Sequence, residues 1–300
     1  MTAITAARPI VVIGKSGQLA EALVRRAGER GVALVTGGRP EVDLTDSETL
    51  KAFVFETKPS VVVNAAAYTA VDQAESDAEA AFALNGEGPA RLAALCAAVG
   101  VPLIHISTDF VFSGLTDVPY PHDAAPSPLG IYGTSKAAGE VGVRLAHPQH
   151  VIVRTSWLYG SAGRNFPKTM LRLGADKGEV RVVDDQVGSP TFADDLADAL
   201  LVVAERISDS EDAQLFGTFH FSNSGHTTWC GFANAVFERA ASAGRPRATA
   251  HPITTHEYPT PAKRPIYSVM DCRRFTDVYG VVPRPWDEAL GAAMPGLLAG

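Results

Sequence analysis

The stretch Pro9-Ile-Val-Val-Ile-Gly-Lys-Ser-Gly-Gln-Leu-Ala20 decides the fold. Its apolar, β-branched start is typical of a buried strand, and residues 21–27 after it are typical of a helix. Gly14 permits the tight turn between the two, and Gly17 lets the backbone approach a pyrophosphate at the helix N-terminus. Strand, glycine turn and helix are the context that a dinucleotide-binding site requires, with a plain strand–helix turn as the alternative. The spacing is GxxGxxA, because Ala20 stands where the usual motif has its third glycine.

Strand-like and helix-like segments alternate from this stretch onward. Further strands are predicted at residues 31–35, 60–64, 102–107 and 150–155. Helices are predicted from a Thr45-to-Glu48 capping box onward and at residues 71–82, 88–99 and 131–145. The repeating order predicts an α/β chain, a Rossmann-type doubly wound parallel sheet with helices on both faces.

The alternation weakens after Trp157, where loops rich in Gly and Pro separate helices near 165–174, 192–206 and 228–241. We therefore expect residues 1–155 to form an NAD(P)-binding domain, with elements returning to it near 185–222. Residues 156–300 are expected to form mainly a smaller, mixed substrate-binding part.

Composition narrows the class of protein. A formal net charge of -7 over 300 residues argues against a nucleic-acid binder, which needs clustered positive charge. Cys96, Cys230 and Cys272 lie far apart and fit reduced thiols of a cytoplasmic protein. Residues 1–8 lack the apolar core of a signal peptide, and no run approaches the roughly 18 apolar residues of a membrane span. The histidines show no metal-ligand spacing, so we expect no protein-built metal site.

Tyr132 and Lys136 stand four residues apart in a predicted helix, so their side chains project from one face. A free phenol titrates near ~10, and a neighbouring cation is expected to lower that pKa. Such a phenol can exchange a proton with a substrate oxygen near neutral pH. The spacing is common on surface helices, but beside a nucleotide site it predicts a catalytic acid.

These motifs together resemble the extended short-chain dehydrogenase/reductases. Gly14-x-x-Gly17, Asn64-Ala-Ala-Ala67, Ser107-Thr108 and Tyr132-x-x-x-Lys136 fall in the order and spacing of that class. Longer stretches look like the dTDP-4-dehydrorhamnose reductase family, over residues 9–290. They are Gly14-Lys-Ser-Gly-Gln-Leu19, Val63-Asn-Ala-Ala-Ala-Tyr-Thr-Ala-Val-Asp72, Ser107-Thr-Asp-Phe-Val-Phe112, Arg154-Thr-Ser-Trp157, Asp185-Gln-Val-Gly-Ser-Pro-Thr191 and Tyr258-Pro-Thr-Pro-Ala-Lys-Arg-Pro265.

The resemblance implies NADPH-dependent reduction of the C4 ketone of dTDP-4-dehydro-L-rhamnose to dTDP-L-rhamnose. Tyr132 would donate the proton, Lys136 would hold the nicotinamide ribose, and Thr108 would polarise the carbonyl. Ser107 and Thr108 face opposite sides of a strand, so only one of them is expected at the ketone, and we expect Thr108. A dTDP-sugar is the expected partner, with no nucleic acid or membrane, and the chain is expected to be a monomer or homodimer. A Mg²⁺ requirement stays open.

Cofactor contacts are expected at Gly14, Ser16, Gly17, Gln18, Leu19, Arg39, Asp43, Leu44, Ala65, Ala66, Ala67, Tyr68, Asn85, Tyr132 and Lys136. Arg39 follows the second strand where an NAD site would carry an acid, which favours NADPH while NADH stays possible. A solvated loop arginine is the alternative for Arg39, and C-capping of a helix is the alternative for Asn85.

Substrate contacts are expected at Thr108, Asp109, Tyr132, Trp157, Asn165, Gln186 and Arg264. Trp157 would be an apolar platform for the 6-deoxy sugar or simply a core residue, and Arg264 would hold the pyrophosphate.

Related activities differ at one neighbouring position. Sugar-nucleotide dehydratases place Asp-Glu after the Ser/Thr, whereas Asp109 is followed here by Phe110, so elimination of water lacks one group. An epimerase or another nucleotide-sugar 4-ketoreductase is excluded less firmly. A non-catalytic NADP-binding regulatory subunit is a further alternative, although it would not need all three of Thr108, Tyr132 and Lys136.

Overall fold

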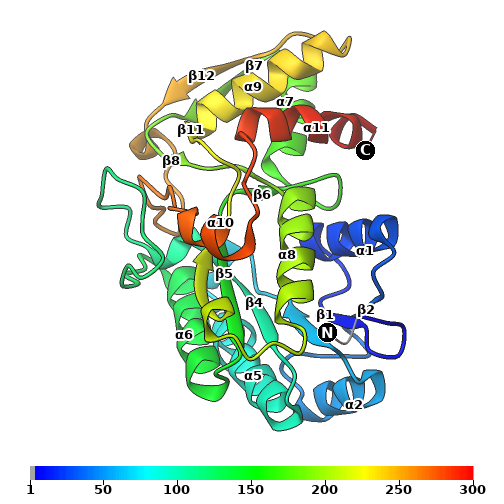
Figure 1. Cartoon of the computed structure of the whole chain (residues 1–300). Helices are drawn as coiled ribbons and strands as arrows, with labels where there is room; N and C mark the ends of the chain where they lie inside the picture. Colours follow the sequence, from blue (N-terminus) through cyan, green and yellow to red (C-terminus); the bar gives the residue numbers. More distant parts are fainter. Residues whose placement is uncertain (1–3, 300) are drawn as a thin grey trace.

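The centre of the computed structural model, which describes residues 4–299, is a six-stranded parallel sheet (Figure 1). Its spatial order is β10-β5-β4-β3-β1-β2. The strands are β1 (Ile10–Ile13), β2 (Leu34–Gly37), β3 (Val61–Asn64), β4 (Leu103–Thr108), β5 (His150–Thr155) and β10 (Gly217–His220). The chain reverses its direction across the sheet between β1 and β3, and ligands of such sheets bind beyond the carboxyl ends of the strands at this point. The predicted doubly wound α/β fold is confirmed.

Helices cover both faces of the sheet. One face carries α1 (Gln18–Arg30), α8 (Ala193–Ile207) and α10 (Arg273–Tyr279), and the other carries α2 (Ser47–Thr57), α5 (Gly88–Val99) and α6 (Ile131–Ala146). Successive residues of β1 alternate between the two cores, since Ile10 and Val12 face one while Val11 and Ile13 face the other. Both faces are therefore apolar, as a parallel sheet requires.

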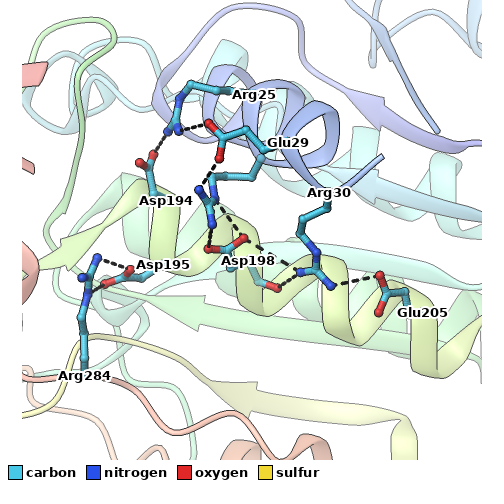
Figure 2. Close-up of polar contacts among 9 residues, drawn as sticks. Arg25, Glu29, Arg30, Asp194, Asp195, Asp198, Glu205 and Arg284 are labelled. Atoms are coloured by element: carbon cyan, nitrogen blue, oxygen red, sulfur yellow. Dashed lines mark hydrogen bonds and ion pairs between the residues drawn. The ribbon is translucent and has the colours of Figure 1, made fainter. Parts of the chain in front are cut away.

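A ladder of ion pairs joins α1 to α8 (Figure 2). Arg25 pairs with Asp194, the Arg26 guanidinium lies 2.7 Å from an Asp198 carboxylate oxygen, and Arg30 reaches Glu205 at 3.1 Å. A network of this kind contributes more than isolated surface pairs, which are worth about 0–1 kcal/mol each. It fixes α1, the helix that starts at the glycine turn, against α8.

The second, smaller part of the structure lies at the top of Figure 1 and has a core of its own. Its helices are α7 (Phe166–Lys177), α9 (Trp229–Ser242) and α11 (Trp286–Ala299). Three two-stranded pairs accompany them: β6 (Leu158–Tyr159) with β9 (Thr191–Phe192), β7 (Glu179–Val183) with β12 (Thr249–Ile253), and β8 (Val187–Gly188) with β11 (Thr227–Thr228). Between these elements the chain returns to the large sheet as α8 and β10.

The expected capping box at the start of α2 is wrong. The N-cap is Asp46, whose side chain accepts hydrogen bonds from the backbone N–H groups of Glu48 and Thr49. Thr45 instead donates its backbone N–H and its hydroxyl to Asp43 Oδ1, both at 2.8 Å. Thr45 and Asp46 can both act as an N-cap, and in the structure the Asp46 carboxylate caps the helix.

Two further predicted elements also differ from expectation. The second strand starts at Leu34 because Gly31 closes α1 in a left-handed conformation, with φ at 66°. The predicted helix 71–82 is broken into α3 (Val71–Ala74) and α4 (Ala78–Phe82) by a turn, and a π-helical turn, η1 (Ala83–Glu87), leads from α4 into α5.

No helix within residues 4–299 is long and apolar enough to cross a membrane.

Candidate active site

Two glycines allow α6 to approach its neighbours closely, one at the segment after β4 and one at η1. A Cβ at Gly133 would lie 2.2 Å from the Phe110 carbonyl oxygen, and one at Gly139 would lie 2.0 Å from that of Asn85. No side chain fits at these distances, so α6 lies with its backbone against its neighbours. The packing brings Tyr132, in the first turn of α6, to the residues that follow β4.

Thr108 and Asp109 form the other side of this junction. The Thr108 hydroxyl donates to Asp109 Oδ1 at 3.0 Å and accepts the Phe110 backbone N–H at 3.2 Å. Phe110 in turn packs edge-on against the Tyr132 ring, with the ring centroids 5.5 Å apart. Burial raises the pKa of Asp109 to about 6, although the hydroxyls of Ser268 and Thr108 oppose the shift. The structure thus brings Thr108, Asp109 and Tyr132 together at the end of β4.

The phenol of Tyr132 is held in its protonated form. Burial raises its pKa to about 12, and the negative charge of Asp109 adds to the shift while the Thr108 hydroxyl opposes it. The expectation that Lys136 lowers this pKa is wrong, because burial of the phenol is the largest effect on it and the Lys136 ammonium donates to the Ile106 carbonyl oxygen. A protonated phenol suits a group that gives up its proton as negative charge develops on a substrate oxygen.

Lys136 lies one turn further along α6 and is buried. Its ammonium donates to the Ile106 carbonyl oxygen at 2.6 Å, which ties α6 to β4. Burial lowers the pKa of Lys136 to about 8, and the charge of Glu140 counteracts the effect. Ser107 points away from this junction, since its hydroxyl donates to Glu140 Oε1 at 2.6 Å. Thr108 is therefore the hydroxyl of the pair that lies beside Tyr132.

The glycine turn after β1 is shaped to admit a phosphate group. Gly14 has φ at 119°, and a Cβ there would lie 3.2 Å from the Ala66 backbone nitrogen. Helix α1 then starts after Gly17 with no side-chain cap, so its first N–H groups point outward without partners. Free N–H groups at a helix N-terminus attract an anion, and this fits the pyrophosphate of a dinucleotide. Ser16 is exposed in this turn, while Leu19 is buried in the core below it.

The loop after β3 is held from two sides. Asn64 Oδ1 accepts the Ala66 backbone N–H at 3.2 Å and so curves the Ala65, Ala66 and Ala67 segment toward the glycine turn. Asn85 accepts the Tyr68 N–H at 2.8 Å and donates to the Tyr68 carbonyl oxygen at 3.0 Å. The suggested C-cap role of Asn85 is wrong, because the helical backbone continues through η1 into α5.

A cation that the sequence analysis missed lies beside the end of β2. The stem of Lys15 is packed so tightly against Gly38 that a Cβ there would lie 2.9 Å from it, and its ammonium pairs with Glu41. Arg39 is exposed next to this pair. The edge of the site where the cofactor ribose is expected thus carries two cations. The lysine inside the glycine turn was the signal available, since that turn folds back onto β2.

Trp157 forms part of an aromatic stack beyond the end of β5. Its backbone has φ at 46°, and its indole lies parallel to that of Trp229, with centroids 3.5 Å apart and 9° between the planes. The Trp229 Nε1–H donates to Gln186 Oε1 at 3.2 Å, and Gly188 leaves the room that the Trp157 ring fills. Trp229 was not expected at the site, because nothing near residue 229 in the sequence links it to residue 157.

Asn165 connects the smaller part to the glycine turn. It is the N-cap of α7, accepting the Lys168 backbone N–H at 3.0 Å. Its amide donates to the Gly160 carbonyl oxygen at 2.7 Å and to Gln18 Oε1 at 3.1 Å. The buried amide thus has a structural task in addition to any contact with a ligand.

Arg264 lies beside α3, where the Asp72 carboxylate engages it. Its guanidinium contacts Asp72 Oδ1 at 3.0 Å and Oδ2 at 2.8 Å, and this pairing holds the pKa of Asp72 below its ordinary value. To bind a pyrophosphate, the Arg264 guanidinium must therefore divide its hydrogen bonds between the ligand and Asp72, or break its ion pair with Asp72.

Residues 4–299 contain no group of three or more His, Cys, Asp or Glu side chains that could hold a metal ion. The two carboxylates in the first turn of α8 form ion pairs with arginines: Asp194 pairs with Arg25 and Asp195 pairs with Arg284 (Figure 2).

A doubly wound sheet with a glycine turn, and a Tyr–Lys pair beside a strand-end Thr, define an extended short-chain dehydrogenase/reductase. Within that class, the chain belongs to the RmlD substrate binding domain family, which matches residues 8–298.

Relatives and solved structures cover almost all of the chain. A dTDP-4-dehydrorhamnose reductase of Sinorhizobium fredii is 42% identical over 280 residues, which is 93% of this chain and 94% of the relative. The crystal structure of a dTDP-4-dehydrorhamnose reductase from Clostridium acetobutylicum superposes with a TM-score of 0.89 at 36% identity, covering 97% of this chain and 100% of that one. One from Bacillus anthracis, solved in complex with NADP, has a TM-score of 0.88 at 35% identity and covers 96% and 99%.

Proposed function

We propose that this chain reduces the C4 ketone of dTDP-4-dehydro-L-rhamnose with NADPH and releases dTDP-L-rhamnose. The observation that carries the proposal is the convergence of Thr108, a protonated Tyr132 and the buried ammonium of Lys136 at one strand end. Membership of the RmlD substrate binding domain family supports the same activity.

The proposed mechanism assigns one task to each of these side chains. When bound, NADPH supplies the hydride, which no amino-acid side chain can provide. Thr108, whose hydroxyl donates to Asp109 in the free enzyme, turns that proton to the ketone oxygen, and a hydrogen-bond donor at this position is worth roughly 3–4 kcal/mol of the barrier. Tyr132 transfers its proton to the same oxygen as negative charge develops there. Lys136 holds the nicotinamide ribose, and its charge favours the phenolate that remains.

The preference for NADPH over NADH rests on the two cations at the end of β2. Lys15 and Arg39 both lie where a ribose 2′-phosphate is expected, and the nearest acid, Glu41, is already paired with Lys15. Arg39→Ala should lower kcat/KM for NADPH about tenfold while changing the value for NADH little. Glu56→Ala, at an exposed position of α2, is a matched surface control. An unchanged ratio of the two values would remove this argument.

The substrate is proposed to lie between the sheet edge and the smaller part, so that residues 156–300 mainly bind it and residues 1–155 mainly bind the cofactor. The Trp157–Trp229 stack would support the 6-deoxy sugar, since a methyl group needs an apolar surface. Gln186, Asn165 and Arg264 would face the dTDP group, with Arg264 on the pyrophosphate. We further propose a cytoplasmic enzyme that acts as a monomer or homodimer.

The direct test follows NADPH absorbance with enzymatically made dTDP-4-dehydro-L-rhamnose and identifies the product by NMR. The proposal predicts consumption of NADPH and formation of dTDP-L-rhamnose. Binding of NADPH without consumption would favour a regulatory subunit, and a product epimerised without oxidation of NADPH would favour an epimerase.

A further inference from the structure

Glu140 is a fully buried carboxylate on α6, one turn beyond Lys136. The guanidinium of Arg154, on β5, holds both of its oxygens, with Nε to Oε1 at 2.8 Å and the second nitrogen to Oε2 at 2.7 Å. Ser107, on β4, donates to Oε1 at 2.6 Å, and Arg144 on α6 reaches Oε2 at 2.7 Å. One side chain therefore links α6 to the neighbouring strands β4 and β5 of the sheet.

We propose that Glu140 is a positioning residue of the reduction, which keeps Lys136 charged and holds α6 in register with the carboxyl end of β4. The inference rests on the proposed function, since it concerns the state of Lys136 during turnover. Glu140 acts on the groups of the site through their neighbours. It accepts a hydrogen bond from Ser107, which directly precedes Thr108 in β4, and it belongs to α6, the helix that also carries Tyr132.

The carboxylate itself stays ionised. Burial works to raise the pKa of Glu140, but the hydrogen bonds and charge of Arg154, with smaller effects of Ser107 and Arg144, hold it below its ordinary value. A buried bidentate ion pair keeps its geometry because neither partner can move into water. Glu140 is therefore a fixed negative charge near the Lys136 ammonium.

The other groups around this charge are cationic or neutral. Facing Glu140 are Arg154, Arg144 and, from β10, His220, whose pKa burial lowers to about 3 so that it stays neutral. Facing Lys136 is His105 of β4, whose pKa lies well below its usual range because of burial and the Lys136 charge. On α6, Tyr132 is protonated, and the charge of Asp109 acts on that phenol. Glu140 is the anion that favours the charged form of Lys136.

The test is the pH dependence of kcat/KM in Glu140→Gln, a change that keeps the shape and removes the charge. Because Lys136 acts while protonated, the rate should fall as the pH rises through its pKa of about 8. Without the negative charge of Glu140, this alkaline limb of the pH profile of kcat/KM should move about one pH unit lower. Glu140→Asp should return the limb toward the wild-type position. Arg144→Gln, which removes a cation from the same carboxylate, should not lower it.

Unpaired Arg154 is a risk to folding in Glu140→Gln, so the second variant is Glu140→Gln/Arg154→Gln, which removes both charges of the buried ion pair. Its alkaline limb should also lie lower than that of the wild type. An unchanged limb in either folded variant would overturn the inference, and so would failure of both variants to fold, which would assign Glu140 a structural task only. Absence of NADPH consumption by the wild type would instead refute the proposed function.

Discussion

Replacing Tyr132 with phenylalanine should separate the chemistry from the fold. The ring packs edge-on against Phe110 at 5.5 Å, and phenylalanine preserves that contact. Thr108 keeps its bonds to Asp109 and to the Phe110 backbone, so no buried polar group is stranded. The folded state should therefore lose no more than about 1 kcal/mol. Removing a general acid should lower kcat by about 10²–10⁴, which corresponds to about 3–5 kcal/mol of barrier.

The assay is single-wavelength detection of NADPH oxidation under saturating keto-sugar, with NADPH affinity measured by fluorescence and stability by thermal unfolding. Tyr159→Phe is the matched control, since that hydroxyl is buried in the smaller part without a hydrogen-bond partner. The control should retain activity. A Tyr132→Phe enzyme with kcat within threefold of the wild type, or one that loses kcat only because it unfolds, would refute the assigned role.

Three further predictions concern the substrate platform, a buried acid and the packing of α6. Trp157→Ala should raise KM for the keto-sugar about tenfold and leave the Kd for NADPH nearly unchanged; the reverse pattern in steady-state kinetics would place the stack elsewhere. Asp109→Asn should raise the free energy of unfolding by up to about 3 kcal/mol at pH 8 and change it little at pH 4. The pKa of Asp109 is raised to about 6 in the folded state, so its ionisation destabilises that state as the pH rises from about 4 through 6. Urea unfolding at both pH values checks this, and an equal change at both would contradict it. Gly139→Ala should lower the free energy of unfolding by about 1–3 kcal/mol, because its Cβ would lie 2.0 Å from a backbone carbonyl oxygen. Gly28→Ala, whose Cβ would have no neighbour within 4 Å, should instead stabilise α1 by about 0.4–1 kcal/mol. Equal melting temperatures for the two variants would contradict this reasoning.

The repeating part of the fold could be predicted because its signals are local. Strand β5 (His150–Thr155) and helix α5 (Gly88–Val99) have the expected bounds, since apolar runs and glycine ends mark them in the sequence itself. The start of α2 was misplaced because Thr45 and Asp46 are both good caps, and the choice depends on where Asp43 lies. Competition between neighbouring caps is decided by tertiary structure.

The site was predictable where one segment carries the chemistry and unpredictable where distant segments meet. Tyr132 and Lys136 share one helix, so their spacing alone places them together. Trp229 reaches Trp157 only because β11, just before α9, pairs with β8, whose Gly188 lies against the Trp157 ring. Lys15 reaches Gly38 only because the glycine turn folds back on β2. The pKa of Tyr132 was predicted with the wrong sign, because burial cannot be read from a spacing.

The central claim is that Thr108, Tyr132 and Lys136 surround a C4 carbonyl that receives hydride. Incubation with NADPH that carries deuterium at both C4 positions of the nicotinamide, followed by NMR of the sugar, tests it most directly. The account predicts one deuterium bonded to C4 of dTDP-L-rhamnose in wild-type enzyme. Deuterium at another carbon, or an unlabelled sugar product, would contradict it.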